Sequence, residues 1–193
     1  AHREAALSLV EQKQIARTTT LPVWQQQGPR NIGGRLTDVE IPASSLQTMY
    51  ACGASGGVFK STDAGATWSA IFDGQPSLSI GDLAIAPSNE NILYVGTGEP
   101  NAGGGSITYD GAGVFKSTDA GATWTSVGLT TSRNIGRIAV DPNNPDIVFV
   151  AAMGDLFGNS VEQGLFRSQD GGATWQQFLF FNDSTGVIDV AID

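Results

Sequence analysis

The sequence contains one cysteine and one histidine among its 193 residues. Cys52 has no partner for an internal disulfide, and a small apolar thiol in the core is its expected role. The only histidine, His2, lies near the start of the chain, where we expect fraying. A Ser-His-Asp triad or a multi-histidine zinc site therefore cannot be assembled from this chain alone.

Positive charge and long apolar runs are also scarce. Ten Lys and Arg residues stand against 19 Asp and Glu residues, for a net charge of -9. Such an acidic surface argues against nucleic acid as a partner, and no 18-residue apolar segment is present to span a membrane. Calcium bound by Asp side chains and backbone carbonyls stays an alternative that no loop pattern supports, and we assign no metal and no cofactor. The chain begins at Ala1 without an initiator methionine or an apolar signal segment, which indicates a processed, trimmed or cloned product.

What the sequence does contain is a repeat. The octapeptide Ser61–Trp68 recurs unchanged at 117–124, and with conservative changes at 168–175. Each copy follows a short run of alternating apolar residues and precedes another, a pattern that predicts a β-hairpin with the octapeptide as its turn. The aspartate can accept hydrogen bonds from turn N–H groups, the glycine supplies a backbone conformation that a β-carbon resists, and the tryptophan is suited to wedging between adjacent sheets. These structural positions are Ser61, Asp63, Gly65, Trp68, Ser117, Asp119, Gly121, Trp124, Ser168, Asp170, Gly172 and Trp175.

The pattern S-x-D-x-G-x-T-W resembles the Asp-box (BNR repeat) of sialidases, the sortilin luminal domain, xyloglucanase-type glycoside hydrolases and related β-propellers. The resemblance covers residues 22–193 and implies a fold rather than an activity, because these boxes lie away from the active-site face in those families. The phrases Ile-Gly-Arg, Val-Gly-Thr-Gly-Glu and Asp-Pro-Asn-Asn-Pro-Asp most resemble large secreted bacterial propellers described as sortilin-like or glycosyl-hydrolase-like. We therefore expect a secreted, periplasmic or cell-surface bacterial protein.

The spacing between repeats predicts four short antiparallel strands per unit, typical of a propeller blade. We name them a to d in chain order, with the octapeptide turn joining c to d. Trp24 occupies the position of the octapeptide tryptophans without an octapeptide of its own, so residues 21–193 hold one d strand, three full blades and one final a strand. The expected a strands are Asp38–Ile41, Asp82–Ala86, Arg137–Asp141 and Asp189–Asp193, and the expected b strands are Thr48–Gly53, Ile92–Thr97 and Ile147–Ala152.

About three and a half blades are fewer than a closed ring normally needs, so we predict an all-β partial β-propeller that belongs to a larger one. Its expected partner is the rest of the same propeller or another protein chain. Residues 1–20 are predicted to be a separate N-terminal leader, with a short helix over residues 3–17 that either packs outside the repeats or binds a partner.

Length differences between the repeats fall on one face of the expected propeller. The b–c loops of the second and third repeats are about 12 and 8 residues longer than that of the first, and long loops on a rigid scaffold commonly carry binding and catalysis. These loops hold carboxylates beside aromatic residues, as glycosidases do, but any solvated acidic loop has the same composition. The catalytic candidates are Glu99, Asp110 and Asp155.

The d–a loops on the same face contain the near-duplicate segments 30–35 and 133–137. One charged residue per blade at the start of strand a predicts a ring of charge around the central channel, which either holds a ligand or consists of paired Arg and Asp side chains. The binding candidates are Arg30, Arg35, Asp38, Asp82, Tyr109, Arg133, Arg137 and Phe157.

Two functions remain open from the sequence. The first is a rigid binding platform that presents its loop face to a protein segment or a glycan. The second is a glycoside hydrolase, xyloglucanase-like or sialidase-like, which requires two carboxyl groups about 5 to 10 Å apart in a cleft. No Arg-Ile-Pro motif of the sialidase type precedes the first octapeptide, and the xyloglucanase catalytic aspartates cannot be transferred by motif.

Overall fold

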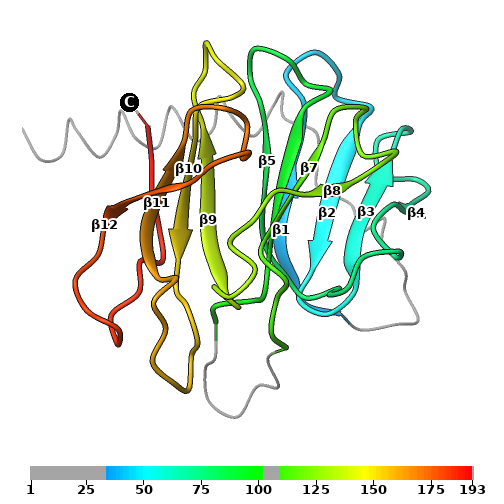
Figure 1. Ribbon diagram of the computed structural model, residues 1–193. Coiled ribbons are helices and arrows are strands. Elements are labelled where there is room, and N and C mark those ends of the chain that lie inside the picture. The colour runs from blue at the N-terminus through cyan, green and yellow to red at the C-terminus, as the bar shows by residue number, and fades with distance from the viewer. Residues whose placement is uncertain (1–33, 102–108, 193) are drawn as a thin grey trace, which may run out of the picture.

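A computed structural model of the chain describes residues 34–101 and 109–192 (Figure 1). The described residues form three four-stranded antiparallel sheets in which each strand pairs with the next in the chain. No helix occurs in these two ranges. This architecture confirms the predicted all-β class and the four-stranded blade.

The three sheets follow one another along the chain, and we call them blades 1, 2 and 3. Blade 1 consists of β1 (Leu36–Glu40), β2 (Met49–Gly53), β3 (Gly57–Ser61) and β4 (Ser69–Ala70). Blade 2 consists of β5 (Ile80–Ile85), β6 (Leu93–Thr97), β7 (Val114–Ser117) and β8 (Thr125–Ser126). Blade 3 consists of β9 (Ile135–Val140), β10 (Val148–Ala152), β11 (Gly164–Ser168) and β12 (Gln176–Leu179).

The predicted strand bounds need two corrections. The a strands start two residues earlier than predicted, because each has a register shift near its first residues that the alternation of apolar residues does not reveal, as between Leu36 and Asp38. The predicted strand Asp189–Asp193 is not a strand as far as residue 192, the last one described, since no neighbouring strand pairs with it there. The leader over residues 1–20, the strand at Trp24 and the candidate Arg30 lie outside the described residues.

The hydrophobic core lies between the blades rather than inside any one of them. Phe72 of blade 1 packs edge to face on Phe115 and Trp124 of blade 2, with ring centroids 5.4 and 5.1 Å apart. Cys52 belongs to the same cluster and is buried. A second cluster joins blade 2 to blade 3 through Tyr94 and Ile138. Each blade thus completes the core of its neighbour.

The two ends of the blades differ, as Figure 1 shows. The octapeptide turns and the a–b turns lie together at one end, the turn face, where Ala64 N–H donates to Gln47 O and Ala120 N–H donates to Asn91 O. The b–c and d–a loops lie at the opposite end, the loop face. This arrangement gives the blades a rigid turn face and leaves the length variation to the loop face.

Candidate functional site

The three octapeptide turns have the same hydrogen bonds. In the first turn, Asp63 accepts from Thr67 N–H and Thr67 Oγ1 at 2.8 and 2.6 Å, while Ser61 Oγ accepts from Gly65 N–H at 2.8 Å. The Thr67 hydroxyl is the main cause that lowers the pKa of Asp63 to about 2, and the other two turns behave alike. A general acid must carry a proton near neutral pH, so carboxylates of this kind suit a turn better than catalysis.

Among the catalytic candidates, Glu99 is withdrawn from solvent. Its side chain is 1% exposed, and the guanidinium of Arg35 from blade 1 donates to both carboxylate oxygens. The backbone of Glu99 is fixed as well, because its N–H donates to Ser79 Oγ and its carbonyl accepts from Asn134 Nδ2. Glu99 therefore joins the loops of blades 1 and 2, in a bidentate ion pair that leaves no free carboxylate oxygen pointing outward.

Asp110 and Asp155, in contrast, come together at the loop face. Arg133 Nη1 lies 2.8 Å from Asp110 Oδ2 and 3.4 Å from Asp155 Oδ2. Because both oxygens contact one nitrogen, they lie at most about 6 Å apart, so the two carboxylates are near enough to each other to be tested as a glycosidase pair. Three loops that are distant in the sequence thus place two carboxylates and one guanidinium at a single point.

The backbone around Arg133 explains how these loops meet. Arg133 has a positive φ of 61°, and its carbonyl accepts from Gly111 N–H at 2.6 Å. The same carbonyl lies against Gly98, where a β-carbon would collide with it and where φ is 82°. Only glycine tolerates both conditions, so Gly98 allows the d–a loop before blade 3 to touch the b–c loop of blade 2.

A hollow with a volume of about 450 Å³ opens beside Asp110 between blades 1 and 2. Ser77 Oγ donates to Asp110 O across its edge at 2.9 Å. Tyr109, which is 55% exposed, contributes the aromatic surface of the hollow. The lining residues are Ser55, Pro76, Ser77, Leu78, Ser79, Tyr109 and Asp110.

Phe157 lies on the b–c loop of blade 3, and its N–H donates to Asp155 Oδ1 at 2.9 Å. Its side chain is 83% exposed. The structure therefore places Phe157 on the same loop as Asp155, with its ring in solvent.

The charged residues along the inner strands pair with each other across the blades. Asp38 Oδ2 accepts from Leu83 N–H at 3.2 Å, and Asp82 Oδ2 accepts from Ile138 N–H at 2.7 Å. Arg137 lies 3.4 Å from Asp82 and 3.7 Å from Asp189. These charged residues thus connect one innermost strand to the next. This is the pairing of Arg and Asp side chains that the sequence analysis gave as the alternative to a ligand site.

Burial raises the pKa of two carboxyl groups in this cluster, Asp82 and Glu40. Desolvation is the main cause that raises the pKa of Asp82 to about 7, against the hydrogen bond from Ile138 N–H, and burial likewise raises the pKa of Glu40 to about 6. Burial also raises the pKa of the Cys52 thiol. Within the described residues, no group of three or more His, Cys, Asp or Glu side chains is arranged to hold a metal ion.

Several polar residues of the loop face were not predicted from the sequence. Asn134 lies in segment 133–137, which the sequence analysis selected for its arginines. The sequence thus indicated where Asn134 lies but not its role. Ser77 and Ser79 belong to no repeat pattern that would single them out. Their roles arise only because the d–a loop of blade 1 folds against the b–c loop of blade 2.

Comparison with known proteins gives relatives of one kind. The xyloglucanase Xgh74A of Acetivibrio thermocellus is 32% identical over 146 residues, which are 70% of this chain and 16% of that protein. A xyloglucanase of a Paenibacillus species is 31% identical over 147 residues, 63% of this chain and 13% of that protein. The crystal structure of the Niastella koreensis GH74 enzyme matches 77% of this chain and 23% of its own, with 29% identity and a TM-score of 0.58.

No family model matches the sequence. In the part of the chain that the structure describes, no helix is long and apolar enough to cross a membrane. The chain spans about one sixth of the length of the first of these relatives. This chain is therefore similar to one part of the GH74 xyloglucanases, which are β-propeller enzymes. The repeats in its sequence and the blades in its structure are consistent with this similarity.

Proposed function

We propose that this chain supplies part of the polysaccharide-binding loop face of a β-propeller glycoside hydrolase similar to the xyloglucanases. The observation that carries the proposal is the hollow between blades 1 and 2, with exposed Tyr109 and Asp110 on one side and serine hydroxyls on the other. An aromatic face can stack on the C–H surface of a sugar ring while nearby polar groups orient its hydroxyls. The octapeptide turns serve, in this proposal, as Asp-boxes that hold the blades at the opposite end.

The charge of the lining favours a neutral glycan. Among the described residues that line the hollow, Asp110 is the charged one, and Arg133 beside it is already paired with two carboxylates. An anionic sugar would need cations that are free to bind it, as in Arg-based carboxylate recognition. A neutral β-glucan of the xyloglucan type needs no free cation, so it fits the hollow better than a sialylated glycan or an acidic peptide does. A polysaccharide too large to cross a membrane also agrees with the expected location outside the cell.

Binding is tested by calorimetric titration of the protein with xyloglucan oligosaccharides. We expect Tyr109→Ala to weaken binding roughly three- to tenfold, because an aromatic contact contributes about 0.5 to 1.5 kcal/mol beyond the area it buries. The matched control is Phe181→Ala, which removes an exposed aromatic ring beyond β12 and should leave the affinity unchanged. Equal affinities for all three proteins, or a preference for sialylated oligosaccharides, would contradict the proposal.

Hydrolysis at this site is a second candidate function, and the closeness of Asp110 to Asp155 favours it. In a glycosidase one carboxyl group donates a proton to the leaving oxygen, while the other acts as nucleophile or activates water. The guanidinium of Arg133 would then orient both groups and balance their charge. The test is the release of reducing ends from xyloglucan by the longest natural polypeptide that contains this sequence. Asp110→Asn and Asp155→Asn should each lower kcat at least a hundredfold, and Asp73→Asn, at an exposed position, is the control. Unchanged turnover in both variants would exclude this pair from catalysis.

A further inference from the structure

Glu99 is held by one residue from each of the three blades. The guanidinium of Arg35 donates to both carboxylate oxygens. Ser79 Oγ accepts from the Glu99 N–H at 3.1 Å, and Asn134 Nδ2 donates to the Glu99 carbonyl at 2.9 Å. Each of these three residues directly precedes the innermost strand of its blade, which is β1, β5 or β9. Three equivalent positions of the repeat thus converge on a single residue of the long b–c loop of blade 2.

The polar cluster around Glu99 is buried. Glu99 and Asn134 are 1% exposed, and Ser79 is 2% exposed. Asn134 Oδ1 is also buried and has no hydrogen-bond partner among the described residues, which is costly in a protein interior. An ion pair with a buried carboxylate returns little net stability, because lost hydration offsets most of the attraction between the charges. Stability of the fold alone therefore does not account for this cluster.

The position of Glu99 determines the position of Asp110 across the base of the same loop. Gly111, which follows Asp110, packs directly on the end of β6, where a β-carbon on Gly111 would lie 2.3 Å from the carbonyl carbon of Thr97. Contact this close leaves no room for the two ends of the loop to slide past each other. A displacement of Glu99 is therefore passed on to Asp110 and to the neighbouring Tyr109.

Asn134 extends this constraint to blade 3. Its carbonyl accepts from Met153 N–H at 2.9 Å, two residues before Asp155. Its neighbour Arg133 contacts the carboxylates of Asp110 and Asp155. The residue that holds the Glu99 carbonyl is therefore connected to both b–c loops that carry the candidate carboxylates.

The ion pair of Arg35 with Glu99 joins the same two blades that border the hollow. Ser55 of blade 1 lines the hollow together with Tyr109 and Asp110 of blade 2. The planar guanidinium engages both carboxylate oxygens, so it fixes their orientation as well as their distance. The ion pair therefore limits how far the two linings of the hollow can separate.

We propose that Glu99 is a positioning residue of the glycan site, which holds Tyr109 and Asp110 at a fixed distance from blade 1 without contacting the sugar itself. This inference rests on the proposed function, because it assigns the role of Glu99 in the same hollow. A site whose loops are already ordered binds a neutral glycan without the cost of ordering them first.

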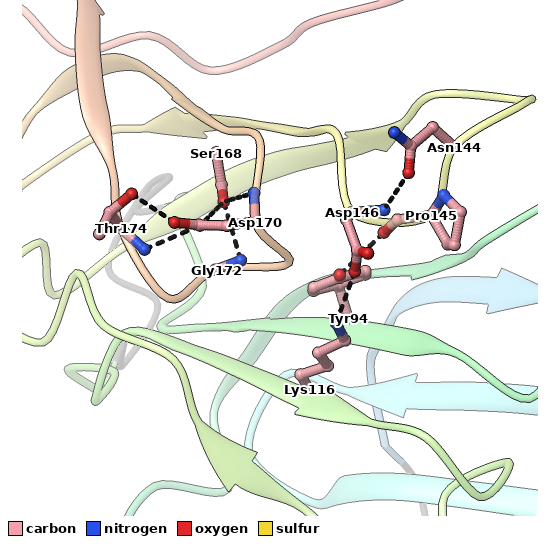
Figure 2. A network of polar contacts seen from close by, with 9 residues as sticks. All are labelled: Tyr94, Lys116, Asn144, Pro145, Asp146, Ser168, Asp170, Gly172 and Thr174. Atoms are coloured by element: carbon pink, nitrogen blue, oxygen red, sulfur yellow. Dashed lines mark hydrogen bonds and ion pairs between the residues drawn. The ribbon is translucent and has the colours of Figure 1, made fainter.

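Glu99→Gln tests the proposal, because it keeps the size of the side chain and removes its charge. The matched control is Asp146→Asn, which neutralises another ion pair between blades. That pair lies at the turn face, where Lys116 Nζ is 3.0 Å from Asp146 Oδ1 (Figure 2). Arg35→Lys keeps the charge but loses the bidentate contact, and it replaces Glu99→Gln if that variant does not fold. All variants are made in the longest natural polypeptide that contains this sequence.

Hydrogen exchange, measured by mass spectrometry, reports whether the loops move. The informative amides are those of Gly111 and Met153, which donate to the loop before β9, and the reference is the Ala64 amide at the turn face. We expect Glu99→Gln to accelerate exchange of the first two at least about tenfold relative to the reference, because a charged hydrogen-bond acceptor is lost. Asp146→Asn should leave this ratio unchanged. Equal acceleration of all three amides would mean that Glu99 only stabilises the fold, and would overturn the proposal.

Calorimetric titration with xyloglucan oligosaccharides reports whether this movement affects the site. Tyr109→Ala is expected to weaken binding roughly three- to tenfold in the native background, but less than about twofold in the Glu99→Gln background, because the ring is no longer held at the hollow. An equal loss in both backgrounds would overturn the proposal. Absence of binding by the native protein would refute the proposed function, and the exchange rates would then still decide whether Glu99 positions the loops.

Discussion

Replacing Asp82 by asparagine tests how the innermost strands are joined. The Asp82 carboxylate is buried between β5 and β9, where Oδ2 accepts from Ile138 N–H and Oδ1 faces Arg137. Asparagine keeps an oxygen that can accept from Ile138 N–H and removes the charge. Asp82→Asn therefore resembles the protonated state of the native side chain.

The expected effect depends on pH. Burial raises the pKa of Asp82 from 3.8 to about 7, so the folded state holds this proton more tightly than the unfolded state. The resulting stabilisation is complete below about pH 4 and is lost as the pH rises through 7. A pKa difference of this size between the folded and unfolded states corresponds to about 4 kcal/mol of folding free energy, at about 1.4 kcal/mol per pKa unit. The pKa of about 7 already includes the lowering effect of the nearby Arg137 guanidinium, so loss of this half-exposed ion pair requires no separate correction.

Urea unfolding monitored by tryptophan fluorescence between pH 4 and pH 8 measures the difference. We expect the variant and the native protein to be about equally stable near pH 4, and the variant to be more stable by about 4 kcal/mol at pH 8. Glu40, Asp38 and the other carboxylates are present in both proteins, so their own titration largely cancels in the comparison. Asp73→Asn, at an exposed position, should show no such trend. A variant that is less stable than the native protein at pH 8, or a difference that does not change with pH, would refute the reasoning.

Two further predictions concern the contacts between blades. Gly121→Ala places a β-carbon 2.6 Å from Ile71 Cδ1 at a φ of 89°, and we expect a loss of about 1 to 3 kcal/mol in urea unfolding. Gly74→Ala, with nothing within 4 Å of the added atom, is its matched control, and equal losses would argue against a steric cause. Trp124→Phe removes the indole donor of the 2.8 Å bond to Ile71 O and should cost at least about 1 kcal/mol, whereas a neutral result would mean that this bond does not hold blades 1 and 2 together.

Much of the fold could be predicted because the sequence repeats. Three copies of one octapeptide establish a common unit, and the alternation of apolar residues on each side of it predicts the strands. The b strands were predicted to within one residue, since both ends of each are bounded by turn residues. The a strands were less well placed, because a register shift near the start of each breaks the alternation.

The sequence predicts only which face of the blades carries the candidate site. Loop lengths indicated which end of the blades varies, and the loops at that end contained the candidate carboxylates. Composition could not separate Glu99, buried in an ion pair with Arg35, from Asp110 and Asp155, which share Arg133. Whether any of these residues acts on a glycan stays a prediction.

The sequence by itself determined the repeating unit, because turn hydrogen bonds and strand alternation are local and need only neighbouring residues. Tertiary structure alone decided which charges meet, since the partners Asp82 and Arg137 come from different blades and their contact depends on how two sheets pack.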